Sequence, residues 1–140
     1  MKTQFKRRLE AELINWKSDA YRKPLILNAA RQVGKTYLMK WLGQNHFTKM
    51  AYFNFDEKPQ LKQFFDNTKD VNLIIENLSI INGAKIDNQT LLILDEIQEC
   101  LPALNTLKYF YENRPELCVI SAGSLLGISL GKSNSFPVGK

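Results

Sequence analysis

Two hydrophobic patterns alternate along the chain. In some stretches apolar residues recur every three or four positions, which is typical of amphipathic helices, and between them lie short, mostly apolar runs typical of buried strands. We expect helices over 3–18, over about ten residues from Tyr37 with a stop at Gly43 and Asn45, and over 59–65, 71–81 and 102–113. We expect strands over 25–27, 50–55, 90–94 and 117–120, followed by a loop-like tail over 126–140. This alternation predicts an α/β fold whose sheet is parallel at its centre, with ligands at the carboxyl ends of the strands.

The residues after the first predicted strand are typical of a phosphate-binding loop. The general pattern G-x-x-x-x-G-K-[ST] brings backbone N–H groups, a lysine and a hydroxyl for Mg²⁺ to the N-terminus of a helix. Gly34, Lys35 and Thr36 match the end of this pattern, whereas Ala29 stands at its first glycine. Alone, these three residues are equally consistent with an ordinary helix start, but a buried strand before them and a helix after them favour phosphate binding.

A pair of carboxylates, Asp95 and Glu96, ends the most apolar predicted strand. An aspartate in this position typically holds the Mg²⁺ coordination sphere of a bound nucleotide, usually through water. A neighbouring glutamate can orient or deprotonate the attacking water. The alternative is an acidic cap for the next helix. Because both motifs occur in the expected order and on the expected elements, the sequence predicts nucleotide binding.

Other polar residues at strand ends are more ambiguous. Ser121 and Ser124 follow the fourth predicted strand, where either could sense a γ-phosphate, with Ser124 favoured, or could be a turn residue. Asn54 and Asp56 end the second strand and could equally serve the site or a turn. The single histidine, His46, receives no role.

Composition excludes several classes of protein. The chain has 140 residues, 44% of them hydrophobic, which is enough for the core of one domain. Apolar runs are far shorter than the roughly 20 residues that span a bilayer, and no secretion signal follows Met1, so we expect a cytoplasmic protein without a membrane partner. Two cysteines without a metal-binding pattern, Cys100 and Cys118, are expected in the core, as are Trp16 and Trp41.

Charge is distributed unevenly along the chain. Residues 1–50 carry 11 Lys and Arg against 3 Asp and Glu, a net +8, whereas residues 51–140 carry 8 against 11, a net −3. The cluster Lys2, Lys6, Arg7 and Arg8 is either a solvated helix face or a surface for an anionic partner such as nucleic acid. A second hypothesis is therefore a regulatory module that binds nucleic acid or protein and uses its phosphate loop for nucleotide sensing or for structure.

Four strings together resemble a family of bacterial and archaeal AAA-type ATPases, over Arg22 to Lys140. They are Arg31-Gln32-Val33-Gly34-Lys35-Thr36, Tyr52-Phe53-Asn54-Phe55-Asp56, Leu94-Asp95-Glu96-Ile97-Gln98 and Ser121-Ala122-Gly123-Ser124. The resemblance implies a three-layer P-loop NTPase fold with strand order 5-1-4-3-2, ATP and Mg²⁺ as ligands, and ATP hydrolysis. Relatives usually add a C-terminal nuclease-like domain of unknown function.

Roles carried over by position follow from this resemblance. Lys35 would contact the β- and γ-phosphates, Thr36 and Asp95 would hold Mg²⁺, and Glu96 would polarise water, with Ser124 as the third catalytic residue. Ala29 and Ala30 stand where the family generally has Gly-Pro. The nucleotide-binding residues would be Ala30, Arg31, Gln32, Val33, Gly34, Lys35, Thr36 and Tyr37.

The resemblance also suggests an incomplete domain. We expect a flanking helix over residues 1–20 and a truncated ATPase domain over 21–140, without the family's fifth strand, lid and second domain. Lys132 and Lys140 lie near where relatives often carry arginine, so no arginine finger is assigned. Since such fingers increase kcat by roughly 10³- to 10⁵-fold, we expect weak or no ATP turnover from this chain. As partners we expect a missing C-terminal domain or further copies of the same chain.

Overall fold

The computed structural model describes residues 2–27, 34–124 and 138–139. Every helix and strand predicted from the hydrophobic pattern is present, with boundaries shifted by a few residues at most. The elements are, in order, α1 (Lys2–Ser18), β1 (Leu25–Leu27), α2 (Lys35–His46), β2 (Lys49–Asn54), η1 (Pro59–Lys62), α3 (Gln63–Asp66), α4 (Val71–Asn82), β3 (Thr90–Asp95), η2 (Ile97–Glu99), α5 (Leu101–Asn113), β4 (Cys118–Ala122) and β5 (Val138–Gly139).

The strands form one sheet in the order β2-β3-β4-β1-β5, and each neighbouring pair is parallel. Read from the other edge, this is the order 5-1-4-3-2 that the family resemblance implies. The expectation that the fifth strand is missing is wrong, because Val138 and Gly139 pair with Ile26 and Leu27 of β1. Two residues are too short a run to stand out in the predicted loop-like tail.

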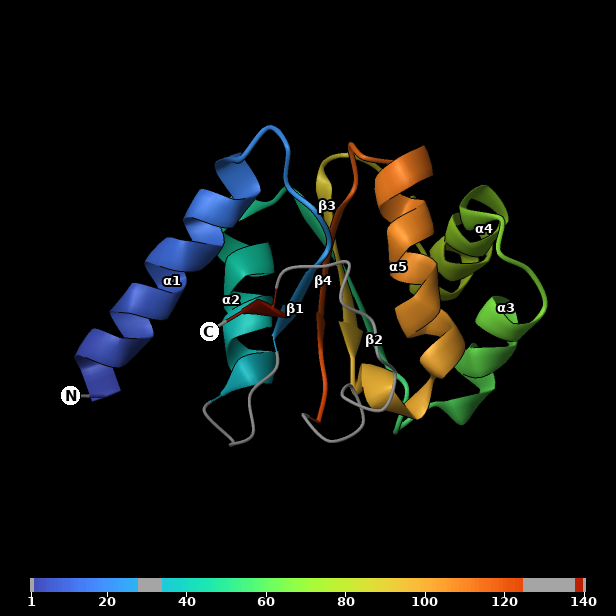
Figure 1. Cartoon of the computed structure of the whole chain (residues 1–140), viewed down its shortest axis with the longest axis horizontal. Coiled ribbons are helices and arrows are strands. Elements are labelled where there is room, and N and C mark those ends of the chain that lie inside the picture. The colour runs from blue at the N-terminus through green and yellow to red at the C-terminus, as the bar shows by residue number, and fades with distance from the viewer. Residues whose placement is uncertain (1, 28–33, 125–137, 140) are drawn as a thin grey trace.

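Helices cover both faces of the sheet, so the molecule has three layers. Figure 1 shows α1 and α2 on one side of the sheet and α3, α4 and α5 on the other. Strand β3 explains why both faces must be covered: Leu91 and Ile93 pack in the core beneath α2, whereas Leu92 and Leu94 pack in the core beneath α5. Side chains of a strand point alternately to opposite faces, so a continuous apolar run needs two apolar layers.

Local signals account for two helix boundaries. Asp70 caps α4 by accepting hydrogen bonds from the N–H groups of Asn72 and Leu73, and Gly83 ends it in the left-handed conformation, with φ 81°. The predicted helix of about ten residues from Tyr37 agrees with the end of α2 at His46, although Gly43, one part of the predicted stop signal, lies inside the helix. A Cβ at Gly43 would lie 2.6 Å from Sδ of Met50, so this glycine serves close packing of α2 against β2.

A parallel sheet places the carboxyl ends of its strands at one edge, which lies at the bottom of Figure 1 together with the start of α2. Thr36 at the start of α2, Asn54 at the end of β2, Asp95 at the end of β3 and Ser124 after β4 all lie around this edge. None of the helices in residues 2–27 and 34–124 has both the length and the apolar character required to cross a membrane.

Candidate functional site

Helix α2 begins directly after Gly34, where the phosphate-loop motif predicts a helix. Gly34 precedes the helix with φ 79° and ψ 36°, a left-handed conformation that residues with a Cβ rarely adopt. Its carbonyl accepts a hydrogen bond from the N–H group of Leu38, at 2.8 Å. Lys35 and Thr36 occupy the first turn, where backbone N–H groups lack partners within the helix. The predicted loop residues Ala29, Ala30, Arg31, Gln32 and Val33 lie outside the described residues.

A hydrogen bond joins the two predicted motifs. Oγ1 of Thr36 donates to Oδ2 of Asp95 at 2.7 Å, and this connects the start of α2 with the end of β3. Asp95 is buried, with 2% of its surface exposed. A hydroxyl and a carboxylate are hard oxygen ligands of the kind that Mg²⁺ prefers. The donor set at this position therefore fits the metal that the sequence predicts.

Tyr52 of β2 also binds Asp95, which the sequence did not predict. Its hydroxyl donates to Oδ2 of Asp95 at 2.6 Å and accepts from Nδ2 of Asn54 at 3.3 Å. Burial, together with the hydrogen bond to Asp95, raises the pKa of Tyr52 to about 12. The ammonium of Lys40 lies 4.1 Å from the centre of the ring. The sequence does carry one signal for this contact: side chains alternate along a strand, so Tyr52 and Asn54 lie on the same face of β2.

Glu96 follows Asp95 in a strained turn. Among the described non-glycine residues it alone has a positive φ, 54° with ψ 47°. Such conformations cost about 1–3 kcal/mol and are concentrated at functional sites. Its N–H group donates to Oδ1 of Asp95 at 2.9 Å. Glu96 directly precedes η2, but its side chain makes no capping hydrogen bond there, and α5 begins only at Leu101. The acidic cap considered for this pair is therefore not formed by Glu96.

Gln98 connects Glu96 with the residues after β4. Its Nε2 donates to Oε1 of Glu96 at 2.8 Å, while its Oε1 accepts from the N–H group of Ser124 at 3.0 Å. A Cβ at Gly123 would lie 2.6 Å from Oε1 of Gln98 and 3.2 Å from Cγ2 of Ile97. Glycine at 123 therefore allows β4 to approach the turn after β3. Gln98, for which no role is predicted from the sequence, thus links the two predicted residues Glu96 and Ser124.

Several other candidates have structural contacts instead. Ser121 is buried inside β4, and its hydroxyl donates to the carbonyl of Leu25 at 3.3 Å, so it supports the pairing of β4 with β1. Oδ1 of Asn54 accepts from the N–H groups of Asp56 and Glu57, at 2.8 and 3.0 Å, which is the turn role considered above. His46 makes an edge contact with Trp41.

Tyr37, the last residue of the predicted nucleotide-binding set, is 53% exposed. Lys6 of α1 donates from Nζ to the hydroxyl of Tyr37 at 3.3 Å and lies 4.4 Å from the ring centre. The basic N-terminal part of α1 is thus in contact with the first turn of α2.

A cleft of about 250 Å³ lies at the opposite edge of the sheet. It is bounded by residues around the amino ends of β2, β3 and β4, namely Lys17, Arg22, His46, Phe47, Thr48, Asn88, Gln89 and Cys118. It is therefore separate from the edge where the predicted site residues meet. Cys118 and Cys100 are both buried and free, as expected.

Known proteins were compared with this chain by family, by sequence and by structure. The model of a family described as AAA domain matches residues 21–140. No curated protein matches the chain. Among solved structures, PCH-2 of C. elegans is similar over 98% of this chain, with a TM-score of 0.49 and 14% sequence identity. That similarity covers 41% of PCH-2, so this chain spans less than half of its length.

Proposed function

This chain belongs to the AAA domain family, and we propose that it binds ATP together with Mg²⁺ at the carboxyl edge of its sheet and hydrolyses the bond between the β- and γ-phosphates, which yields ADP and phosphate. The observation that carries the proposal is the 2.7 Å hydrogen bond between Thr36 and Asp95. It joins a hydroxyl and a carboxylate from two motifs that are far apart in sequence, and it does so beside the start of a helix, where phosphate binds readily.

Nucleotide binding is assigned to the start of α2 and the loop before it. Lys35 contacts the β- and γ-phosphates in this proposal, and Thr36 and Asp95 hold Mg²⁺. Mg²⁺ supplies positive charge against the phosphate oxygens when it is bound. The residues proposed to contact the nucleotide are Ala30, Arg31, Gln32, Val33, Gly34, Lys35, Thr36 and Tyr37, and the backbone amides of residues 30–36 would surround its phosphates.

The hydrolytic step is assigned to Glu96. Its carboxylate would accept a hydrogen bond from the attacking water and orient it toward the γ-phosphate. Gln98 is in position to hold that carboxylate, since Nε2 of Gln98 lies 2.8 Å from Oε1 of Glu96. Ser124, exposed after β4, would contact the γ-phosphate. Because Gln98 also binds the N–H group of Ser124, one side chain places both groups.

We further propose that residues 21–140 form the ATPase domain and residues 1–20 a flanking helix. Leu9 and Leu13 of this helix are buried in the same cluster as Leu38 and Leu42 of α2. Turnover by a single copy of the chain is proposed to be weak, because an arginine finger from a second copy would complete the site. Arginine fingers contribute roughly 10³ to 10⁵ in kcat where they have been measured.

Calorimetry with Mg·ATP tests the binding proposal. We expect Lys35→Ala to bind Mg·ATP at least tenfold more weakly than the wild type, since a charge-assisted contact contributes about 1.5–3 kcal/mol. Lys69→Ala, which removes an exposed lysine between α3 and α4, is the matched control and should bind as the wild type does. Equal affinities of all three proteins would refute the proposed site. Glu96→Gln should keep Mg·ATP affinity and lose whatever hydrolysis the wild type has.

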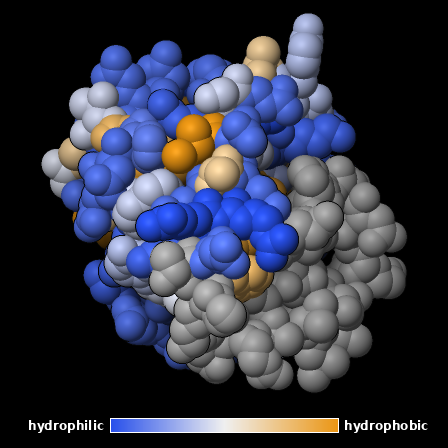
Figure 2. Space-filling model, turned by 90° about the vertical axis from the view of Figure 1, so that its left-hand side faces the viewer, coloured by the Kyte–Doolittle hydropathy of each residue, from blue (hydrophilic) through white to orange (hydrophobic). Residues whose placement is uncertain are grey.

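A second candidate function is the binding of nucleic acid by α1. The observation that favours it is the exposure of Lys6, Arg7 and Arg8 along one segment of this helix, on the mainly hydrophilic face seen in Figure 2. Binding of this kind should weaken steeply with salt, with a log–log slope near −0.9 for each phosphate neutralised. Absence of binding to single- or double-stranded DNA and RNA at low salt would exclude it.

A further inference from the structure

The carboxylate of Asp95 is held by three donors, which come from α2, from β2 and from the turn that follows β3. Oδ2 accepts from the hydroxyls of Thr36, at 2.7 Å, and Tyr52, at 2.6 Å, while Oδ1 accepts from the N–H group of Glu96 at 2.9 Å. The final torsion of an aspartate side chain is broad, so its carboxylate turns easily unless it is held. Donors on both oxygens restrict that rotation.

We propose that Tyr52 is a positioning residue for the metal, and that its hydroxyl keeps the Asp95 carboxylate in the orientation that holds Mg²⁺ with the nucleotide. This inference rests on the proposed function, because it concerns the same Mg²⁺. Thr36 has a second task in that function, as its hydroxyl oxygen is itself assigned to the metal. Tyr52 has no such task, so its hydroxyl is available solely to orient Asp95.

Tyr52 is itself well placed for this role. The parallel pairing of β2 with β3 sets Tyr52 opposite Ile93 and Asn54 opposite Asp95, so the backbone fixes the distance between the ring and the carboxylate. The direction of the hydrogen bond follows from chemistry, because an ionised carboxylate only accepts. Nδ2 of Asn54 donates to the phenol oxygen at 3.3 Å and leaves the phenol hydrogen for Asp95.

Helix α2 supports both ends of this hydrogen bond. Thr36 and Lys40 are four residues apart in α2 and therefore lie on the same face of the helix. Thr36 reaches Asp95, and the ammonium of Lys40 lies 4.1 Å from the centre of the Tyr52 ring. A cation over an aromatic face is attracted to it, which keeps the ring in place. The start of the nucleotide-binding helix is thus coupled to the orientation of the metal-binding carboxylate.

The test is calorimetric titration of ATP, with Mg²⁺ and with a chelator, into the wild type and Tyr52→Phe. Phenylalanine keeps the ring and removes only the hydroxyl. Loss of an outer partner of a metal ligand typically weakens metal affinity by 10- to 100-fold. Mg²⁺ is expected to increase the affinity for ATP, and we compare the Mg²⁺ concentration at which half of that increase is reached. This concentration should be about tenfold higher for Tyr52→Phe than for the wild type. Its affinity for ATP in chelator should remain within about twofold of the wild type, because the phosphate contacts are intact.

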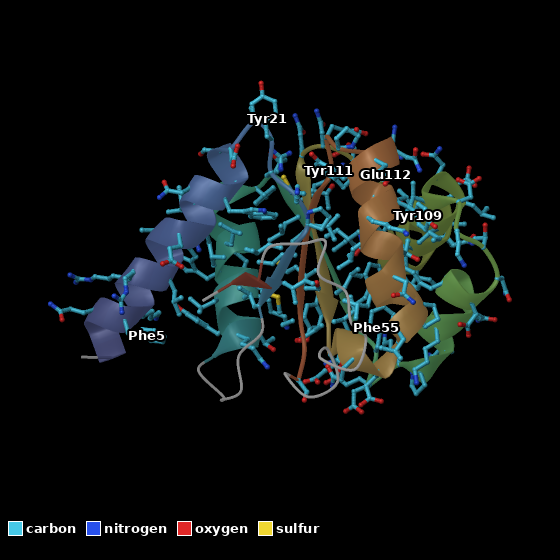
Figure 3. All side chains as sticks on the ribbon, viewed as in Figure 1. Phe5, Tyr21, Phe55, Tyr109, Tyr111 and Glu112 are labelled. Atoms are coloured by element: carbon cyan, nitrogen blue, oxygen red, sulfur yellow. The ribbon has the colours of Figure 1, made fainter. Side chains whose placement is uncertain are left out.

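Two controls separate orientation of Asp95 from a general structural role. Tyr109→Phe also removes a phenol hydroxyl, but from α5 on the other side of the sheet, as Figure 3 shows, and it should leave both titrations unchanged. In an Asp95→Asn background, Tyr52→Phe should cause no further loss of the Mg²⁺ effect, because its target carboxylate is gone.

Each remaining outcome overturns the inference in a recognisable way. An unchanged Mg²⁺ requirement in Tyr52→Phe, with ATP binding that still depends on Lys35, would overturn the role of Tyr52 and leave the proposed function standing. Equal losses with and without Mg²⁺, or a Tyr52→Phe chain that fails to fold, would assign the hydroxyl to folding instead. A wild type that does not bind Mg·ATP would overturn the proposed function and this inference together.

Discussion

Replacing Gly34 with alanine should have two separate effects, a loss of folding stability from backbone strain and a loss of ATP affinity at the proposed site. Gly34 has φ 79°, and a Cβ built on it would meet only Cβ of Tyr37, at an ordinary 3.8 Å. Steric collision therefore contributes little, and the destabilisation should equal the penalty of the left-handed conformation, about 1–2 kcal/mol. For a domain of this size that penalty lowers Tm by roughly 3–6 °C.

Gly83 provides a matched control for this substitution. It ends α4 with φ 81°, and a Cβ there would meet nothing within 4 Å. Gly83→Ala should therefore lose the same stability, about 1–2 kcal/mol, by the same mechanism. It lies away from the carboxyl edge of the sheet, however, so ATP affinity should not change. Gly34→Ala should bind ATP at least tenfold more weakly, because small shifts of the strained backbone move the N–H groups of the helix start away from the proposed phosphate position.

The assay for the Gly34 prediction is thermal denaturation together with calorimetric titration of Mg·ATP for the wild type and both variants. Gly34→Asn should fall between the wild type and Gly34→Ala in stability, since asparagine tolerates the left-handed region better than alanine. The reasoning is refuted if Gly34→Ala is as stable as the wild type, or if both variants lose equal stability and both keep full ATP affinity.

Three further substitutions or measurements follow from the packing. Gly123→Ala should reduce ATPase activity by at least tenfold with little change in Mg·ATP affinity, because the new Cβ displaces Gln98; unchanged turnover in a phosphate-release assay would contradict this. Cys100 and Cys118 should react slowly with a thiol reagent at pH 8 and rapidly in urea, since burial raises the pKa of both thiols; fast native labelling would be inconsistent with their burial. Asp70→Ala should lose about 0.5–2 kcal/mol in urea denaturation as the α4 cap is removed, and an unchanged midpoint would show that the cap contributes nothing.

The order of the elements could be predicted because each one carries its own periodic signal. The run from Leu91 to Leu94 is apolar on both faces, and the structure places its alternate residues in two separate cores. The fifth strand was missed for the same reason, since a strand of two residues is too short to show a hydrophobic period. Gly43 is one part of the predicted stop signal yet lies inside α2, because its small size is what the packing against Met50 requires.

The predicted site was incomplete because its missing members depend on register. Tyr52 is an aromatic residue in a strand and is indistinguishable from a core residue until β2 is aligned with β3. Gln98 lies in η2, a short 3₁₀ turn without a hydrophobic period, and its partner Ser124 is 26 positions away. In contrast, Thr36 and Asp95 are parts of motifs whose spacing already encodes the chemistry.

The adjacent carboxylates Asp95 and Glu96 serve different parts of the proposed site, the metal position and the water position, because the chain turns at Glu96. The left-handed backbone at Glu96 turns the chain sharply at the end of β3. Asp95 is thereby held by Thr36 of α2 and Tyr52 of β2, whereas Glu96 is held by Gln98, which in turn binds the N–H group of Ser124 after β4. If the first part holds the metal and the second orients water, disturbance of the first should change the Mg²⁺ requirement, and disturbance of the second should change turnover at saturating Mg²⁺. The strained residue therefore allows consecutive positions to perform separable tasks.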